Sequence, residues 1–325
     1  MIDYIDRPRF LSDQTKRDIS SAQTKAAAQI KIWDHMLSNW SDYSNYSTPK
    51  YKILKQRCRK GIPSNVRGRV WFMLCKGLEV QNSYPHHLYF RLCNREEDPP
   101  CMLDITKDVS RTFPEHFLFV RQGGQQSLTN ILRAYAFLDP EIGYCQGMAY
   151  IVGVFLMHVD EESAFWMLVS FMYNYQMRGY YMQGMAKVYQ SLYKANYLLK
   201  LHEPALWKKF AKSEFYPQIY AMQWFMTLFT FSFNIDTVLR IWDCFLLEGP
   251  KILFRVFLSF FKLHKNDLIN LSFENLLAGI RRIETSLDAD LLLRAAFNIT
   301  LSRKELLQID REYQNAPNPV LINWK

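Results

Sequence analysis

Apolar side chains recur along most of this chain at the spacing of a helix rather than of a strand. They line one helix face in two clear stretches, formed by Val66, Val70, Trp71, Leu74, Cys75 and Leu78 and by Met185, Val188, Tyr189, Leu192 and Tyr193. Further segments of helical pattern are Leu128 to Leu138, Gln146 to Met157, Ser163 to Tyr173, Ala221 to Phe231, Thr237 to Leu247 and Phe273 to Ile283. No segment shows the alternation of a half-buried strand. The pattern predicts an all-α protein.

The chain before residue 51 differs in composition from the rest. Residues Ser12 to Trp40 contain neither Pro nor Gly, which predicts a long helix that Ser12 or Asp13 caps. The turn-rich segment SDYSNYSTPK follows it. No internal repeat is visible, so a single elongated helical domain is favoured over a solenoid. We expect a helical extension and linker over 1–50, a helical core over 51–262, and C-terminal helices over 263–325 that pack on the core or extend it.

Composition excludes several classes of protein. The chain has 325 residues, of which 49% are hydrophobic, enough for a large core. Its six cysteines include no CxxC pair, which favours a reducing, cytoplasmic setting over a disulfide framework. The nearest approach to a zinc cluster has spacings that match no familiar finger, and buried thiols and surface imidazoles are the preferred interpretation; its members are Cys75, His86, His87, Cys93 and Cys101. The N-terminus lacks the apolar segment of a signal peptide.

Three polar stretches are unusual for a simple helical bundle. In the first, Arg59 to Trp71, a helix opening at Pro63 or Ser64 places Arg67 on the same face as Trp71. A guanidinium among apolar neighbours needs a carboxylate or several carbonyls, because an unpaired buried charge is very costly. The alternative is that Arg67 extends along Trp71 to water.

The second stretch, Ile105 to Pro114, contains an Asp-x-x-Arg pair. Pro114 disfavours a helical Phe113, so the helix should end near Ser110 or Arg111, with Arg111 free to reach outward. Asp108 lies within side-chain range of Arg111 on one turn and would fix its pose. The alternative is an ordinary solvated surface bridge.

The third stretch, Asp139 to Met148, reads as a loop followed by an apolar helix. Gln146 then lies near that helix's N-terminus, where its amide can donate to and accept from a docked partner. Gly147 would allow another surface to approach the backbone closely. The alternative is a simple helix cap with a small residue for tight packing.

Together these stretches resemble the TBC-domain family of Rab GTPase-activating proteins. The resemblance covers roughly Tyr51 to Lys262. It rests on G-I-P-x-x-x-R-x-x-x-W at 61–71, I-x-x-D-x-x-R-T-F-P at 105–114 and Y-C-Q-G at 144–147, and on the later segments Tyr216-Pro217, Gln223-Trp224-Phe225, Arg240-Ile241-Trp242-Asp243 and Glu248-Gly249-Pro250. One departure is Ala149, where the family usually has Asn.

The resemblance implies a mechanism with two catalytic side chains supplied to a GTP-bound Rab. Arg111 matches the arginine finger and Gln146 the glutamine finger, while Asp108, Arg67 and Tyr144 match supporting residues. The chain lacks G-x-x-x-x-G-K-[ST], so we expect no cofactor of its own, with GTP and Mg²⁺ arriving on the GTPase. The sequence specifies neither the particular Rab nor an oligomeric state.

Two other functions compete with this interpretation. The first is a binding module of the same fold that recognises a GTPase without stimulating hydrolysis. The second is a binder of nucleic acid or of an anionic membrane, suggested by the formal net charge of +9 and the basic run Lys50 to Lys60. That run is also explained by a solvated helix face or a patch facing an acidic GTPase, with peripheral membrane contact as an accessory role. We expect a protein partner and no nucleic acid.

Overall fold

The structure, a computed structural model, describes residues 13–315 as helices and turns, with no strand in that range. The earlier helices are α1 (Asp13–Ser38), α2 (Trp40–Ser44), α3 (Pro49–Lys60), α4 (Ser64–Leu74), α5 (Gly77–Asn82), α6 (Leu88–Cys93), α7 (Met102–Arg111), α8 (Phe117–Arg121), α9 (Gly124–Leu138), α10 (Met148–Leu156) and α11 (Glu161–Tyr173). The later ones are the 3-10 helix η1 (Met177–Tyr180), α12 (Ala186–His202), α13 (Pro204–Lys212), α14 (Pro217–Tyr220), α15 (Met222–Met226), α16 (Ile235–Glu248), α17 (Lys251–Ile269), α18 (Phe273–Thr285), α19 (Ala289–Asn298) and α20 (Arg303–Gln314). The all-α prediction is confirmed.

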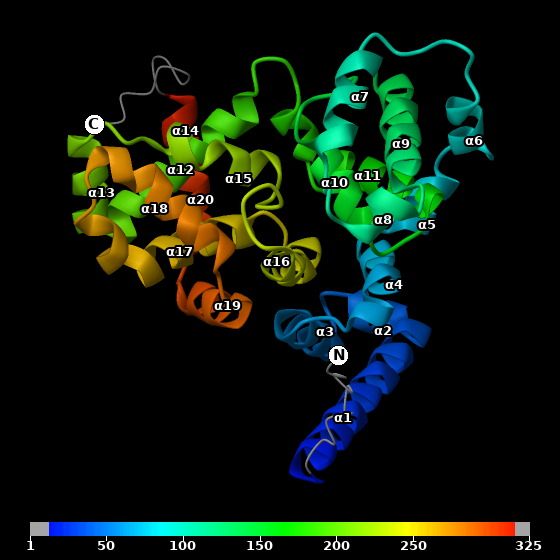
Figure 1. The fold of residues 1–325 in the computed structure, drawn as a ribbon, viewed down its shortest axis with the longest axis horizontal. Coiled ribbons are helices and arrows are strands. Elements are labelled where there is room, and N and C mark those ends of the chain that lie inside the picture. The colour runs from blue at the N-terminus through cyan, green and yellow to red at the C-terminus, as the bar shows by residue number, and fades with distance from the viewer. Residues whose placement is uncertain (1–12, 316–325) are drawn as a thin grey trace, which may run out of the picture.

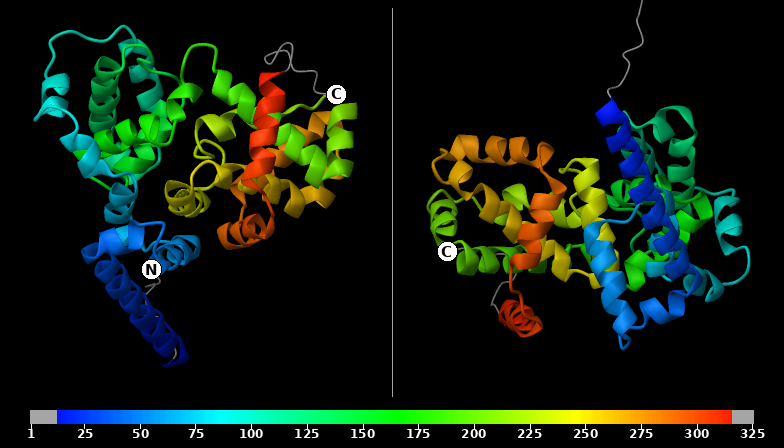
Figure 2. Two further views of the ribbon diagram at one scale, coloured as in Figure 1. Left: turned by 180° about the vertical axis from the view of Figure 1, so that it is seen from behind. Right: turned by 90° about the horizontal axis from the view of Figure 1, so that it is seen from below.

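The helices form one elongated domain. Figure 1 shows α4 to α11 gathered on one side and α12 to α20 on the other, with α1 projecting away from the first group. Figure 2 shows the same arrangement from behind and from below. A single cluster of buried apolar side chains runs from Trp33 in α1 to Tyr313 in α20. This core crosses the boundaries at residues 51 and 262, which stay predictions.

The N-terminal extension is a packed part of the domain. Trp33 and Met36, on one face of α1, are each only 1% exposed. On the neighbouring face, Asp34 pairs with Arg69 of α4 at 2.7 Å. Ser12, a candidate cap, lies outside the described residues, and Asp13 is already helical. Part of the predicted linker is helical as well, because α2 extends to Ser44.

The helix predicted over Ala221 to Phe231 is wrong. Within this range the structure has only the short helix α15, after which Leu228 and Phe229 adopt positive φ angles of 47° and 68°. Trp242 Nε1 donates to the Leu228 carbonyl at 3.2 Å, and Phe229 packs against Trp224. Tertiary packing of these large rings overrides the local helical preference.

A buried ion pair fastens α4 to α16. Asp243 is 0% exposed, and its two carboxylate oxygens accept four hydrogen bonds. They come from Arg67 Nε at 3.1 Å and Nη2 at 3.3 Å, Trp71 Nε1 at 2.9 Å and the Ile62 amide at 2.8 Å. Burial raises the pKa of Asp243, whereas these donors favour its charged form. The prediction that Arg67 needs a carboxylate or several carbonyls is confirmed, the partner being the Asp243 carboxylate, and the alternative that it extends to water is wrong.

The same helix α4 crosses closely over the end of α10. A Cβ at Gly68 would lie 2.0 Å from the carbonyl oxygen of His158, so no larger residue fits there. Asp243 holds α4, and α4 in turn abuts the chain at the end of α10, the helix that follows Gln146.

We expect Asp243→Ala to destabilise the fold by about 3 to 5 kcal/mol, because it leaves Arg67 buried without a counter-charge. The matched control is Asp290→Ala, since Asp290 also pairs with an arginine, Arg240, but its side chain is 66% exposed. That change should cost less than about 1 kcal/mol. Urea unfolding measures both, and equal losses of stability would contradict this account of the core.

Candidate functional site

Arg111 stands at the exposed end of α7. The helix ends at Arg111, as predicted, and Thr112 follows it with extended backbone angles. The Arg111 side chain is 53% exposed, and its Nε and Nη2 donate to Asp108 Oδ1 at 3.0 Å and 2.5 Å. No hydrogen bond or ion pair occupies Nη1 within the described chain. Arg111 is thus oriented by one carboxylate oxygen while part of its guanidinium faces outward.

Asp108 is itself fixed by Tyr144. The Tyr144 hydroxyl donates to Asp108 Oδ2 at 2.5 Å, so both carboxylate oxygens are engaged. Burial, together with the neighbouring Asp108 carboxylate, raises the pKa of Tyr144, which keeps its phenol protonated as a donor. Asp108 is 9% exposed, unlike the solvated surface bridge considered as the alternative. Tyr144 thus orients Asp108, and Asp108 orients the Arg111 guanidinium on its inward side.

Gln146 lies in the loop before α10. The predicted helix over Gln146 to Met157 starts two residues later than predicted, at Met148, and Gly147 is its N-cap with a φ of 105°. Gln146 is therefore not the helix cap. Its side chain is exposed and makes no hydrogen bond to any described residue. A Cβ at Gly147 would lie 3.3 Å from Thr227 Cγ2, so this glycine serves backbone conformation and local packing.

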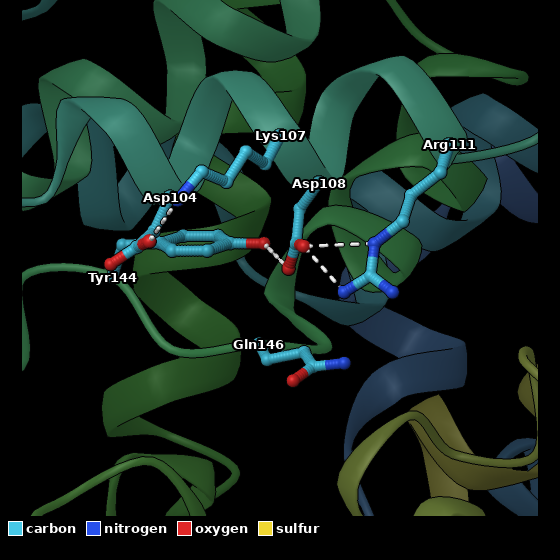
Figure 3. Close-up of a pocket in the computed structure, with 6 residues that line it drawn as sticks. All are labelled: Asp104, Lys107, Asp108, Arg111, Tyr144 and Gln146. Atoms are coloured by element: carbon cyan, nitrogen blue, oxygen red, sulfur yellow. Dashed lines mark hydrogen bonds and ion pairs between the residues drawn. The ribbon is translucent and has the colours of Figure 1, made fainter.

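Arg111 and Gln146 face the same open pocket of about 420 Å³. Figure 3 shows both side chains with Asp108 and Tyr144 around this hollow. Two further residues of α7, Asp104 and Lys107, also line it and were missed by sequence reasoning. Their helical spacing from Arg111 was the available signal. The pocket is polar and open to a large partner.

Arg67 lies outside this pocket. Its partner is Asp243, and among the described residues no hydrogen bond or ion pair joins it to Arg111 or Gln146. Any support it gives to the site passes through the scaffold. Ala149, the departure from the family pattern, is 1% exposed within α10.

The basic run of α3 is partly neutralised inside the protein. Lys50 pairs with Asp42 at 2.7 Å, and Lys55 and Arg59 both pair with Glu248, at 2.8 Å and 2.6 Å. Much of this charge therefore serves internal pairing, which weakens the case for a nucleic-acid surface.

Within residues 13–315, no three His, Cys, Asp or Glu side chains gather as metal ligands would. None of the described helices has the length and apolar character needed to cross a bilayer.

Fold and site together define an all-helical domain that presents an arginine and a glutamine in one open pocket. The model of the Rab-GTPase-TBC domain matches residues 64–269. The chain belongs to this family.

Similar proteins and solved structures also include members of this family. The human "Ecotropic viral integration site 5 protein homolog" is 32% identical over 87% of this chain, and the Drosophila melanogaster "TBC1 domain family member whacked" is 35% identical over 75%. The chain spans 34% and 66% of these two relatives. The crystal structure of the Chlamydomonas flagellar RabGAP TBC domain is 26% identical, with a TM-score of 0.74 over 86% of this chain and 94% of that one.

We expect the Tyr144 hydroxyl and the Asp108 carboxylate to be energetically coupled. A double-mutant cycle with Tyr144→Phe and Asp108→Asn, measured by unfolding, should give a coupling energy of about 1 to 2 kcal/mol, because the hydrogen bond between these side chains has a charged acceptor. Asp104→Asn, in the same pocket but 72% exposed, is the control partner for Tyr144→Phe and should show almost no coupling. Equal coupling in both cycles would contradict the arrangement.

Proposed function

We propose that this chain accelerates GTP hydrolysis on a GTP-bound Rab-type small GTPase by supplying Arg111 and Gln146. The observation that carries the proposal is that both side chains are exposed and line one pocket, although Arg111 ends α7 and Gln146 lies in the loop before α10. Membership of the Rab-GTPase-TBC domain family supports the class of partner. The chain acts as an activator, since the bond is broken on the partner.

The chemistry explains why these two residue types belong together. In GTP hydrolysis the barrier lies in aligning a water and in stabilising charge on the transferring phosphoryl group and the leaving oxygen. A guanidinium offers permanently charged donors in a fixed plane, which an ammonium does not reproduce. Arg111 Nη1 makes no bond within the described chain and is available for those oxygens.

Gln146 complements this role. Its amide can accept a hydrogen bond from the attacking water and donate to a neighbouring group, which orients the water. No described residue competes for that amide. In this proposal Gln146 positions the water, Arg111 stabilises charge, and Asp108 and Tyr144 aim the arginine.

We expect Arg111→Ala and Arg111→Lys each to remove most of the stimulation, by about 10³- to 10⁵-fold for the alanine variant. Gln146→Ala should also lose most activity. The measurement is a panel of GTP-loaded Rab proteins assayed for hydrolysis with each variant, with circular dichroism confirming the fold. Near wild-type stimulation by Arg111→Ala would refute the mechanism, and binding without acceleration by the wild type would favour the binding-module alternative.

We further propose that GTP and Mg²⁺ are brought by the GTPase, at the cytoplasmic face of membranes to which this chain is recruited peripherally. Calorimetric titration of the isolated chain with Mg²⁺-GTP should then show no binding. Saturable binding at micromolar nucleotide would contradict this division of labour.

A further inference from the structure

The backbone leaving α7 makes a sharp turn immediately after Arg111. Phe113 has a φ of 49°, in the left-handed region that residues other than glycine rarely adopt. As predicted, Phe113 does not adopt the right-handed helical conformation before Pro114. Its backbone takes the strained left-handed conformation, however, and not the extended one. Such a conformation persists only where the surrounding structure enforces it.

Packing against α10 supplies that enforcement. A Cβ at Gly153 would lie 2.8 Å from Phe113 Cε2 and 2.9 Å from Cδ2, so the ring occupies the space that the missing side chain leaves. Phe119 stacks on the ring with centroids 5.8 Å apart, and Tyr150 meets it edge-on at 5.5 Å. Phe113 is thereby held by α8 and α10.

The turn has a further anchor on α7. Thr112 is completely buried, and its Oγ1 donates to the Asp108 carbonyl at 2.6 Å. The segment between Arg111 and the ring is therefore short and fixed at both ends. A displacement of the Phe113 ring would be transmitted to the end of α7, where Arg111 stands.

The helix that receives the ring begins two residues after Gln146. Gln146 and Gly147 lead directly into α10, and Gly153 lies on the next turns of the same helix. The helix α10 thus contacts the end of α7 through the Phe113 ring and directly follows the loop that holds Gln146.

We propose that Phe113, seated against Gly153, is a positioning residue that sets Arg111 relative to Gln146. The expected change in kcat rests on the proposed function, whereas the expected change in the position of Arg111 does not. Three variants test it: Gly153→Ala, Phe113→Leu and the double variant. The control is Gly279→Ala. Gly279 is also a buried helical glycine, but it lies in α18, in the other group of helices (Figure 1), and a Cβ there would meet Leu271 Cδ1 at 2.6 Å.

For a Rab that the chain accelerates, Gly153→Ala should lower kcat roughly 10- to 100-fold with little change in KM. The displaced arginine would weaken an interaction that is made in the transition state rather than in the bound ground state. Phe113→Leu lacks Cε2, the nearer of the two ring carbons that the new methyl meets. Adding Gly153→Ala to it should therefore cost nothing further, within about threefold. Gly279→Ala should keep the wild-type kcat. An unchanged kcat in Gly153→Ala, or additive losses in the double variant, would overturn the inference.

A second readout does not need GTPase activity. In arginine-labelled protein, the Nε–H NMR signal of Arg111, identified by its absence in Arg111→Lys, should shift in Gly153→Ala and stay in place in Gly279→Ala. An unshifted signal overturns the inference even if kcat falls. If the wild type accelerates no Rab, the proposed function fails while this signal still decides the positioning role. Should Gly153→Ala not fold, Phe113→Leu alone must shift the signal.

Discussion

The buried carboxylate of Asp243 is the constraint on which the arrangement of the domain depends. It draws Arg67, Trp71 and the Ile62 amide onto α16 from a part of the chain 172 to 181 residues earlier. Charge buried at this depth is tolerated only when each oxygen is fully hydrogen-bonded. The Gly-Ile-Pro and Arg-Ile-Trp-Asp segments, which look unrelated in the sequence, are the two halves of one contact.

The pocket is built on the opposite principle. Arg111 and Asp108 form a half-exposed ion pair, in which the arginine side chain is 53% exposed and the aspartate side chain only 12%. Its value is orientation, because Tyr144 fixes the second carboxylate oxygen and leaves the guanidinium facing out. A fully buried pair holds the scaffold, and a half-exposed pair orients the side chain that a partner would meet.

Local rules predicted the all-α class and the end of α7 before Pro114, because helical periodicity and the steric effect of proline act over a few residues. They also indicated that a buried Arg67 needs a partner, either a carboxylate or several carbonyls. They could not say which one, since Asp243 lies 176 residues away in sequence. The break after α15 was missed because Trp242 and the packed rings impose it. Lys107 and Asp104 were missed because their role depends on the pocket rather than on any motif.

The central claim is that Arg111 and Gln146 act on the transition state of the partner's reaction. It is tested most directly by comparing the affinity of this chain for a GDP-bound Rab with and without fluoroaluminate, which completes a mimic of that state. Transition-state complementarity predicts at least about 100-fold tighter binding with the mimic, and Arg111→Ala should abolish the gain. Equal affinity in both conditions, for a Rab whose hydrolysis the chain accelerates, would contradict the account.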